Sequence, residues 1–282
     1  MRRAAAAAAL AALLAVPASA GAQEVAPNRA TTYLHPTDVR DARAVWVNPA
    51  GLGVLRDASV YAELAVANPG ARGRLRQINA GFNARGLAFA YQRDVLSAGA
   101  RGHTYRLGLA GASEGLAAGF AVALYRGNTK ATGWDVGVVY NRIPALTVGA
   151  AITNIGQPLV RGLEQRLTYV PGVTWRPPHL GSSVTLSAHT RITPDSVVAY
   201  ALGLGWQGGG RGRWEVSRRL PIGIFARIDT DGGLRRGAFA VGLSIGGADR
   251  VGAVVSTPGD VSGVEAASLY GLSTRTPLGA RR

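Results

Sequence analysis

Large apolar residues alternate with Gly, Ala, Thr or charged residues along most of the chain from residue 59 onward. In the segment 134–141, Trp134 and Val136 fall on one face whereas Asp135 falls on the other, because successive side chains of a strand point to opposite sides. The segments 146–153 and 239–245 repeat this pattern. The pattern predicts a succession of strands, each with one apolar face and one face of small or polar residues.

Fourteen such strands are predicted, separated by breakers rich in Gly, Pro and Asn. About 220 residues over these strands leave ~16 residues for each strand and its connection, enough for the 9–11-residue strands that cross a bilayer. A further strand or closing segment is expected at 268–276. The expected bounds are 59–66, 74–82, 86–93, 103–111, 116–126, 133–141, 145–154, 166–175, 183–192, 197–206, 212–219, 222–229, 236–246 and 249–256.

The second faces of these segments favour a membrane barrel over a soluble two-sheet sandwich. A sandwich would expose faces rich in Lys, Glu and Asp, whereas these faces consist of small residues, as in 117–123 and 199–205. Gly is abundant, at 39 residues, and inside a barrel it leaves room in the lumen. The predicted fold is therefore all-β, an antiparallel transmembrane β-barrel of about 14 strands with its apolar face toward lipid.

Aromatic residues near the strand ends agree with a barrel in a bilayer. A girdle of Trp and Tyr at the level of the lipid head groups is typical of such barrels, although these residues also form ordinary strands. The residues expected on the apolar face are Tyr91, Tyr125, Trp134, Tyr140, Trp175 and Trp206.

The beginning of the chain has the features of a secretory signal peptide. A charged start is followed by an Ala/Leu run to Val16 and then by the small residues of a cleavage site. The run is shorter than the ~20 residues of a spanning helix. We expect a signal peptide at 1–22, an N-terminal appendage at 23–58 and a barrel at 59–282, placed in the cell outer membrane.

The formal net charge of +15 could suggest binding to nucleic acid. The predicted signal peptide contains two of the arginines, and the remaining basic residues are spread from Arg29 to Arg282, with no cluster interleaved with stacking aromatics, so no nucleic-acid partner is expected. Rim arginines suit bidentate pairing with anionic head groups, which makes outer-membrane lipid an expected partner; solvated loops are the alternative. The chain has no Cys and no carboxylate–His cluster with metal-ligand spacing, so neither a metal nor another cofactor is expected.

Two patterns suggest catalysis, and both lack the context that they need. Residues 111–115 match G-x-S-x-G, but a nucleophile elbow requires a strand-to-helix turn and this motif joins two predicted strands. Ser187 and His189 share a face but stand ~6–7 Å apart along a strand, beyond the ~3 Å that a general base requires. We therefore expect no enzyme; a lipid-modifying enzyme in the barrel wall is the weakest alternative.

Polar residues on the inward faces are predicted to line the lumen. Buried charges need partners, so Arg and Asp side chains from nearby strands are expected to pair or to hold a plug. A wet interior without selectivity is the alternative. The predicted lumen-lining residues are Arg106, Asp135, His189, Arg191, Arg227 and Asp229.

The stretch 41–52, with the sequence DARAVWVNPAGL, resembles the N-terminal segment of the FadL-type outer-membrane transport proteins and related accessory barrels. The resemblance implies a fourteen-stranded barrel whose N-terminal hatch, here 23–58, enters the lumen. An ordinary turn before the first strand is the alternative. This chain is short for that family and does not end on an aromatic residue. The implied hatch residues are Asn48, Pro49, Ala50 and Gly51.

From this resemblance and the Gly-rich interior, we expect a passive conduit for small hydrophobic, fatty-acid-like compounds through a plugged lumen. An apolar ligand would bind near the hatch, beside Trp46, Leu52 and Leu55. The alternative is a structural or secretion-accessory barrel whose lumen stays shut.

Overall fold

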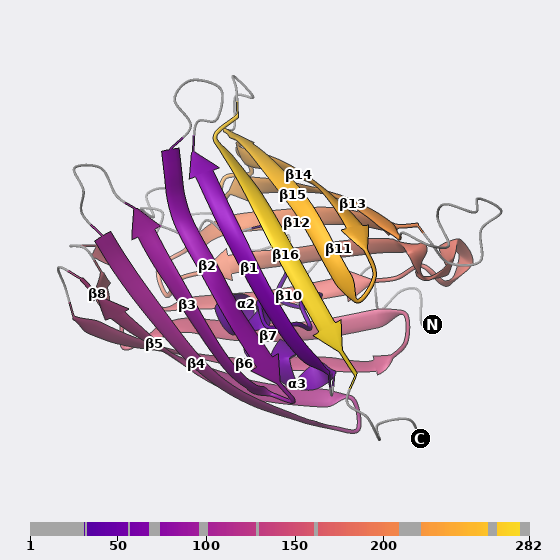
Figure 1. The fold of residues 1–282 in the computed structure, drawn as a ribbon, viewed down its shortest axis with the longest axis horizontal. Coiled ribbons are helices and arrows are strands. Elements are labelled where there is room, and N and C mark those ends of the chain that lie inside the picture. The colour runs from indigo at the N-terminus through magenta and orange to yellow at the C-terminus, as the bar shows by residue number, and fades with distance from the viewer. Residues whose placement is uncertain are drawn as a thin grey trace.

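The chain folds into a closed antiparallel barrel of fourteen strands (Figure 1). The computed structural model describes residues 31, 33–55, 57–67, 74–95, 101–127, 130–160, 163–208, 221–258 and 264–276. Successive strands of the wall are hydrogen-bonded neighbours, and β1 (Ala58–Ala67) pairs with β16 (Ala266–Arg275) to close it. Closure leaves no sheet edge with unpaired backbone groups, as spanning a bilayer requires.

The other wall strands follow in chain order between these two. They are β2 (Arg74–Ala84), β3 (Leu87–Val95), β4 (Arg101–Ser113), β5 (Leu116–Arg126), β6 (Ala131–Ile143), β7 (Leu146–Ile155), β10 (Thr168–Trp175), β11 (Val184–Ile192), β12 (Val197–Gln207), β13 (Ile222–Asp231), β14 (Arg236–Gly246) and β15 (Asp249–Pro258).

A few short elements are not part of this wall. They are the β8 (Leu159–Val160) and β9 (Leu163–Glu164) hairpin, the 3-10 helix η2 (Pro178–Ser183), and the single-turn helices α2 (Ala44–Val47) and α3 (Gly51–Val54). Within the described ranges, no helix is long and apolar enough to cross a membrane.

The predicted barrel of about 14 strands is confirmed. Thirteen predicted strands match the wall within a few residues, and those at 116–126 and 236–246 have the predicted bounds. The segment expected at 268–276 is the last wall strand, β16. The strand expected at 212–219 and the signal peptide at 1–22 lie outside the described residues. The β8–β9 hairpin was not expected, because two-residue strands carry no alternation.

The two faces of the wall differ as the alternation predicts. On β3, Leu87 is 56% exposed, whereas its inward neighbours Ala88 and Ala90 are almost fully buried. On the outer face of β4, Leu107 and Leu109 are about half exposed. A continuous outer surface of large apolar side chains suits contact with hydrocarbon rather than with water.

Most of the predicted aromatic girdle faces outward, but Tyr125 does not. Trp134, Trp175 and Trp206 are between 43% and 47% exposed on the outer face. Tyr125 shares the inward face of β5 with Ala121 and Ala123, and it hydrogen-bonds the Arg106 side chain. The phenol finds a partner for its hydroxyl in the polar lumen, so this part of the girdle prediction is wrong.

The two ends of the barrel have different connections. Four connections at one end are two-residue turns, at 85–86, 114–115, 144–145 and 247–248. In the turns at 85–86 and 114–115 both residues have positive φ, which matches the twist of tight hairpins. We call this end the tight-turn end and the opposite end, which carries the connections 68–73 and 96–100, the loop end.

Candidate functional site

Residues 33–55, which we call the N-terminal segment, run through the interior of the barrel. Figure 1 shows α2 and α3, in indigo, enclosed by the strands of the wall. Ala42, Val45 and Leu52 of this segment have no exposed surface. The segment therefore occupies space that the small inward residues of the wall leave open.

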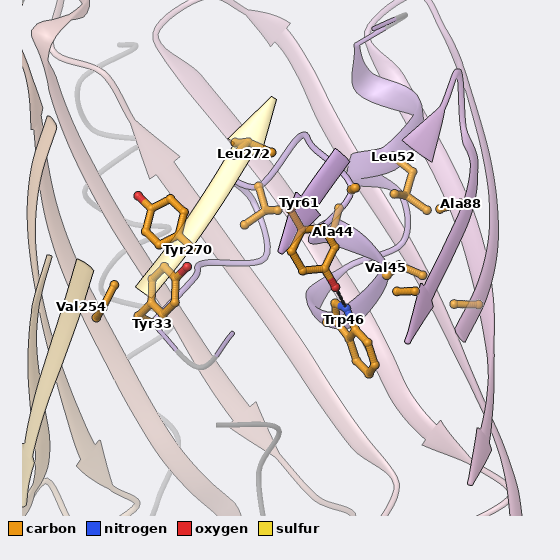
Figure 2. Close-up of a cluster of buried hydrophobic side chains, with 14 of the residues drawn as sticks. Tyr33, Ala44, Val45, Trp46, Leu52, Tyr61, Ala88, Val254, Tyr270 and Leu272 are labelled. Atoms are coloured by element: carbon orange, nitrogen blue, oxygen red, sulfur yellow. Dashed lines mark hydrogen bonds between the residues drawn. The ribbon is translucent and has the colours of Figure 1, made fainter. Parts of the chain in front are cut away.

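The apolar side of the segment packs against small residues of β3 and β4. Val45 and Leu52 lie in one buried cluster with Ala88, as Figure 2 shows. A Cβ atom added to Gly108 would lie 2.8 Å from Cδ1 of Leu52 and 3.0 Å from Cγ2 of Val45. A larger residue at this position would force the Leu52 and Val45 side chains to shift. The glycine-rich inner face is thus shaped to receive the segment.

Asn48, between the two helical turns, is fully buried and bonds to the wall. Its Nδ2 donates to the carbonyl oxygens of Val138 and Ala150, each at 3.4 Å, and its Oδ1 accepts from the backbone N–H of Ala50 at 3.1 Å. The Asn48 side chain occupies the place that a Cβ atom on Gly137 of β6 would take. Asn48 is thus fixed both by its hydrogen bonds and by a gap in the wall that fits it.

Trp46 enters a chain of polar side chains on the β1–β2 wall. Its indole N–H donates to the hydroxyl of Tyr61, drawn as a dashed line in Figure 2, and Tyr61 donates to Oδ1 of Asn79 at 2.7 Å. The guanidinium of Arg106 lies 4.9 Å from the centre of the Trp46 ring, close enough for a cation–π contact. The tryptophan is only 8% exposed, so its polar and aromatic groups are both satisfied by the protein.

Arg106 ties the segment to a buried ion pair. Its Nη1 donates to the carbonyl oxygen of Val45 at 2.9 Å and forms an ion pair with Asp135. Both side chains of the pair are less than 10% exposed. Removing one partner would leave a buried charge without compensation, which is strongly destabilising.

The beginning of the segment bonds to the opposite wall, β10 to β13. Leu34 offers its carbonyl oxygen to Arg227 at 2.8 Å, and Thr37 shares a hydroxyl hydrogen bond of 2.7 Å with Thr174. Asp38 forms an ion pair with Arg176, just beyond β10. The segment therefore crosses the lumen and is held on both sides, by noncovalent contacts alone in the described residues.

His35 makes the most unusual of these contacts. Its Nδ1 lies 3.0 Å from Nδ1 of His189, so one imidazole donates and the other accepts. Burial, and then the positive charge of Arg227, lower the pKa of His35 well below its usual value, which keeps its ring neutral. Its Nε2 is buried without a hydrogen-bond partner and points at Gly203, where a Cβ atom would clash with it.

A second polar cluster holds residues 41–43 against β1 and β16. The guanidinium of Arg43 donates to the Asp41 carboxylate at 2.8 and 2.9 Å and to the Tyr33 hydroxyl at 3.1 Å. It also lies 5.0 Å from the centre of the Tyr270 ring, which stacks on Tyr33 (Figure 2). This arrangement neutralises a cation inside the lumen.

The structure places the predicted hatch and ligand residues in two environments. Asn48, Ala50 and Leu52 are buried against the wall, whereas Leu55 is 38% exposed at the end of the segment. Pro49 and Gly51 are buried with them, and Gly51 packs against the carbonyl oxygen of Val39. Trp46 and Leu52 therefore belong to one buried cluster, whereas Leu55 lies at the exposed end of the segment.

The predicted lumen-lining residues all occupy inward positions of the wall. Arg106, Asp135, His189 and Arg227 are buried and, apart from Asp135, contact the segment directly. Arg191 and Asp229 are half-buried, and Asp229 pairs with Arg227 at 2.6 Å. Ser187 hydrogen-bonds Thr174 rather than His189.

Several residues that hold the segment were missed by the sequence analysis. Asn83 donates to the carbonyl oxygen of Leu52, and Ser59 accepts from the backbone N–H of Ala42. Asn79 and Glu63 are buried on the same inward faces. Strict alternation along the predicted strands would have placed Ser59, Glu63 and Asn79 inward. The contact between His35 and His189 has no sequence signal, because the two residues are 154 positions apart.

Solved structures with a similar fold include a monoaromatic hydrocarbon channel and a toluene transporter. The barrel aligns with the CymD monoaromatic hydrocarbon channel at a TM-score of 0.55 and 10% identity, covering 94% of this chain and 98% of that one. It aligns with the Ralstonia pickettii toluene transporter TbuX at a TM-score of 0.54 and 12% identity, covering 86% and 98%. A Pseudomonas aeruginosa FadL homologue aligns at a TM-score of 0.41 and 10% identity, over 88% and 96%.

By sequence the chain has no comparable match. No protein-family model matches it, and a search of the curated proteins finds no significant relative. The likeness to the solved channels is therefore one of fold. The predicted resemblance to outer-membrane transport barrels holds at that level.

Proposed function

We propose that this barrel is a passive conduit for small hydrophobic compounds in the cell outer membrane, and that residues 33–55 are its hatch. The observation that carries the proposal is the way in which the segment fills the lumen. It is bonded to two opposite walls through side chains and single carbonyl oxygens rather than through a strand ladder. Such contacts can break on one wall while the other wall holds the segment.

The fold supports the class of substrate. The two similar barrels with the higher TM-scores are a monoaromatic hydrocarbon channel and a toluene transporter. In this chain, the apolar residues Val45 and Leu52 meet Ala88 in the lumen. An apolar ligand that displaced Leu52 from this contact would meet the uncharged residues Val45, Ala88 and Gly108, and no cofactor would be required.

Uptake by whole cells tests the proposal. Cells whose outer membrane is otherwise a barrier should accumulate radiolabelled toluene faster when they produce this barrel than when they carry the empty vector. Changing the hatch by the double substitution Asn48→Ala and Pro49→Ala should alter that rate severalfold, because the wall contacts of Asn48 are lost.

The sequence offers a matched control. The same dipeptide recurs at 68–69, between β1 and β2, and the double substitution Asn68→Ala and Pro69→Ala should leave uptake at the wild-type rate. No uptake above the vector control, or equal rates for the two double variants, would contradict the proposal.

A sealed structural barrel is the second candidate, because the segment is anchored at many points. Planar-bilayer recordings separate the two functions. A sealed barrel gives no ligand-sensitive current, whereas a conduit changes its conductance when toluene is added.

A further inference from the structure

The outer face of β3, β4 and β5 is ordered in rows across the strands. Register pairs place Phe89 beside Leu107, and Tyr91 beside Tyr105 one row closer to the loop end. The next row joins Arg93 to His103 and His103 to Arg126. From Leu87 to Arg93 the strand rises ~20 Å along its own axis, which is ~15 Å along the membrane normal at the usual tilt of such strands. The wall therefore changes from apolar to aromatic to cationic over about the thickness of one hydrocarbon leaflet.

All three residues of this last row, which we call the cationic row, face away from the lumen. On β3 the inward positions are Ala88, Ala90, Gln92 and Asp94, so Arg93 points outward. On β4 the inward Arg106 fixes His103 on the outer face, and on β5 Ala121 and Ala123 do the same for Arg126. The row is thus on the lipid-facing surface.

Hydrogen bonds and ring stacking hold the side chains of the cationic row in place. The Tyr91 hydroxyl and Nδ1 of His103 share a hydrogen bond of 2.7 Å, and their rings stack with centres 5.9 Å apart. Arg126 donates from Nη1 to the carbonyl oxygens of Tyr125 and Ala131, which holds its exposed guanidinium at the end of β5. Nε of Arg93 is buried and has no hydrogen-bond partner among the described residues.

No acidic group opposes the guanidinium groups of Arg93 and Arg126 on the outward positions of these strands. None of the outward positions of β3, β4 and β5 carries a carboxylate. The nearby Asp94 points inward, where Gln77 and Gln92 donate to it at 2.7 and 3.0 Å. The row therefore presents uncompensated positive charge at the height where lipid head groups lie.

We propose that the cationic row is a binding site for the phosphate of an anionic lipid in the leaflet at the loop end. Guanidinium groups bind phosphate bidentately, and the Tyr91–His103 pair leaves one imidazole nitrogen free for the same oxygens. The lipid's acyl chains would lie on Phe89, Leu107 and the apolar rows below them. The site does not depend on passage through the lumen.

Native mass spectrometry of the full chain tests the site. The protein, exchanged into mixed micelles with equal amounts of phosphatidylglycerol and phosphatidylcholine of identical acyl chains, should retain phosphatidylglycerol preferentially. The double substitution Arg93→Gln and Arg126→Gln should reduce that preference about tenfold, since each basic residue near a membrane surface contributes appreciably to binding of anionic lipid.

A matched control removes the same charge elsewhere. Arg85 and Arg142 are exposed at the tight-turn end, and Arg85→Gln with Arg142→Gln should leave the preference unchanged. The charge-conserving Arg93→Lys and Arg126→Lys variant should retain part of it, and circular dichroism checks that all variants keep their strand content.

Three results would overturn the proposal. They are an unchanged preference in the Arg93 and Arg126 double variant, an equal loss in the control variant, and full displacement of the lipid by millimolar inorganic phosphate. The last result would identify a site for free anions rather than for lipid.

Discussion

At the scale of single residues, the lumen is defined by which inward positions have no side chain. Gly108 and Gly137 leave the space that Leu52 and Asn48 fill, while Gly111 on the same wall has nothing within 4 Å of its absent Cβ. Strand alternation separates Gly111 from the other two, because it falls on the outward face of β4 with Leu107 and Leu109. Only the path of the segment shows which inward glycines receive one of its side chains.

This difference gives a paired prediction. Gly137→Ala should place a methyl group on the Asn48 side chain and weaken docking of the segment by about 1–3 kcal/mol, the usual cost of overpacking. Gly111→Ala should leave docking unchanged. Hydrogen exchange of the amides in residues 33–55 measures docking, while the unfolding midpoint reports on the barrel. Equal protection of the segment in the two variants would show that Asn48 does not depend on the gap at Gly137.

Strand alternation predicts which face of the wall a residue lies on, but not which residue it contacts. Alternation puts Arg106, Asp135 and Arg227 on inward positions, where they are buried, because the period of two is set by the backbone. It could not pair Arg106 with the carbonyl oxygen of Val45, nor His35 with His189. Those contacts depend on how the N-terminal segment crosses the lumen, and irregular chain has no period from which its path can be calculated.

At the scale of elements, the first part of the segment depends on neutral His35. The ring contacts His189 on β11 and lies near Arg227 on β13, which in turn pairs with Asp229. A second positive charge beside Arg227 would be unfavourable, which agrees with the lowered pKa of His35. An undocked histidine titrates near its usual value of about 6.5.

Acid should therefore loosen this part of the segment. Below about pH 6.5 the undocked state binds more protons than the docked state, so docking weakens as the pH falls, with a slope approaching about 1.4 kcal/mol per pH unit. Above that pH the contribution of His35 is constant. Hydrogen exchange of residues 33–38 at pH 7.5 and pH 5.5 should show the loss of protection.

Two single variants test whether His35 causes this pH dependence. His35→Gln should reduce the difference between the two pH values, whereas His179→Gln, at an exposed histidine in η2, should leave it as in the wild type. A full pH response in His35→Gln would place the titrating group elsewhere.

The bounds of the strands were easier to predict than the pairing that closes the barrel. The segments 116–126 and 236–246 could be bounded to the residue because Gly and charged residues interrupt the alternation on both sides. The sequence did not decide whether 268–276 forms a strand, because no feature of that segment indicates that it closes the barrel. Its role follows from β1, which lacks a second neighbour until β16 pairs with it.

At the scale of the whole molecule, a conduit with this structure must release its segment from at least one wall. Thr37 and Thr174 allow that step to be blocked, because their Oγ atoms are 2.7 Å apart and the chain has no native Cys. A disulfide between Thr37→Cys and Thr174→Cys would fix the segment to β10. Oxidised cells should take up toluene no faster than vector controls, and a reductant should restore uptake. Each single-cysteine variant should transport under both conditions. Uptake at the wild-type rate with the disulfide formed would mean that substrate passes without movement of this part of the segment, and would confine any gate to residues 44–55 on the opposite wall.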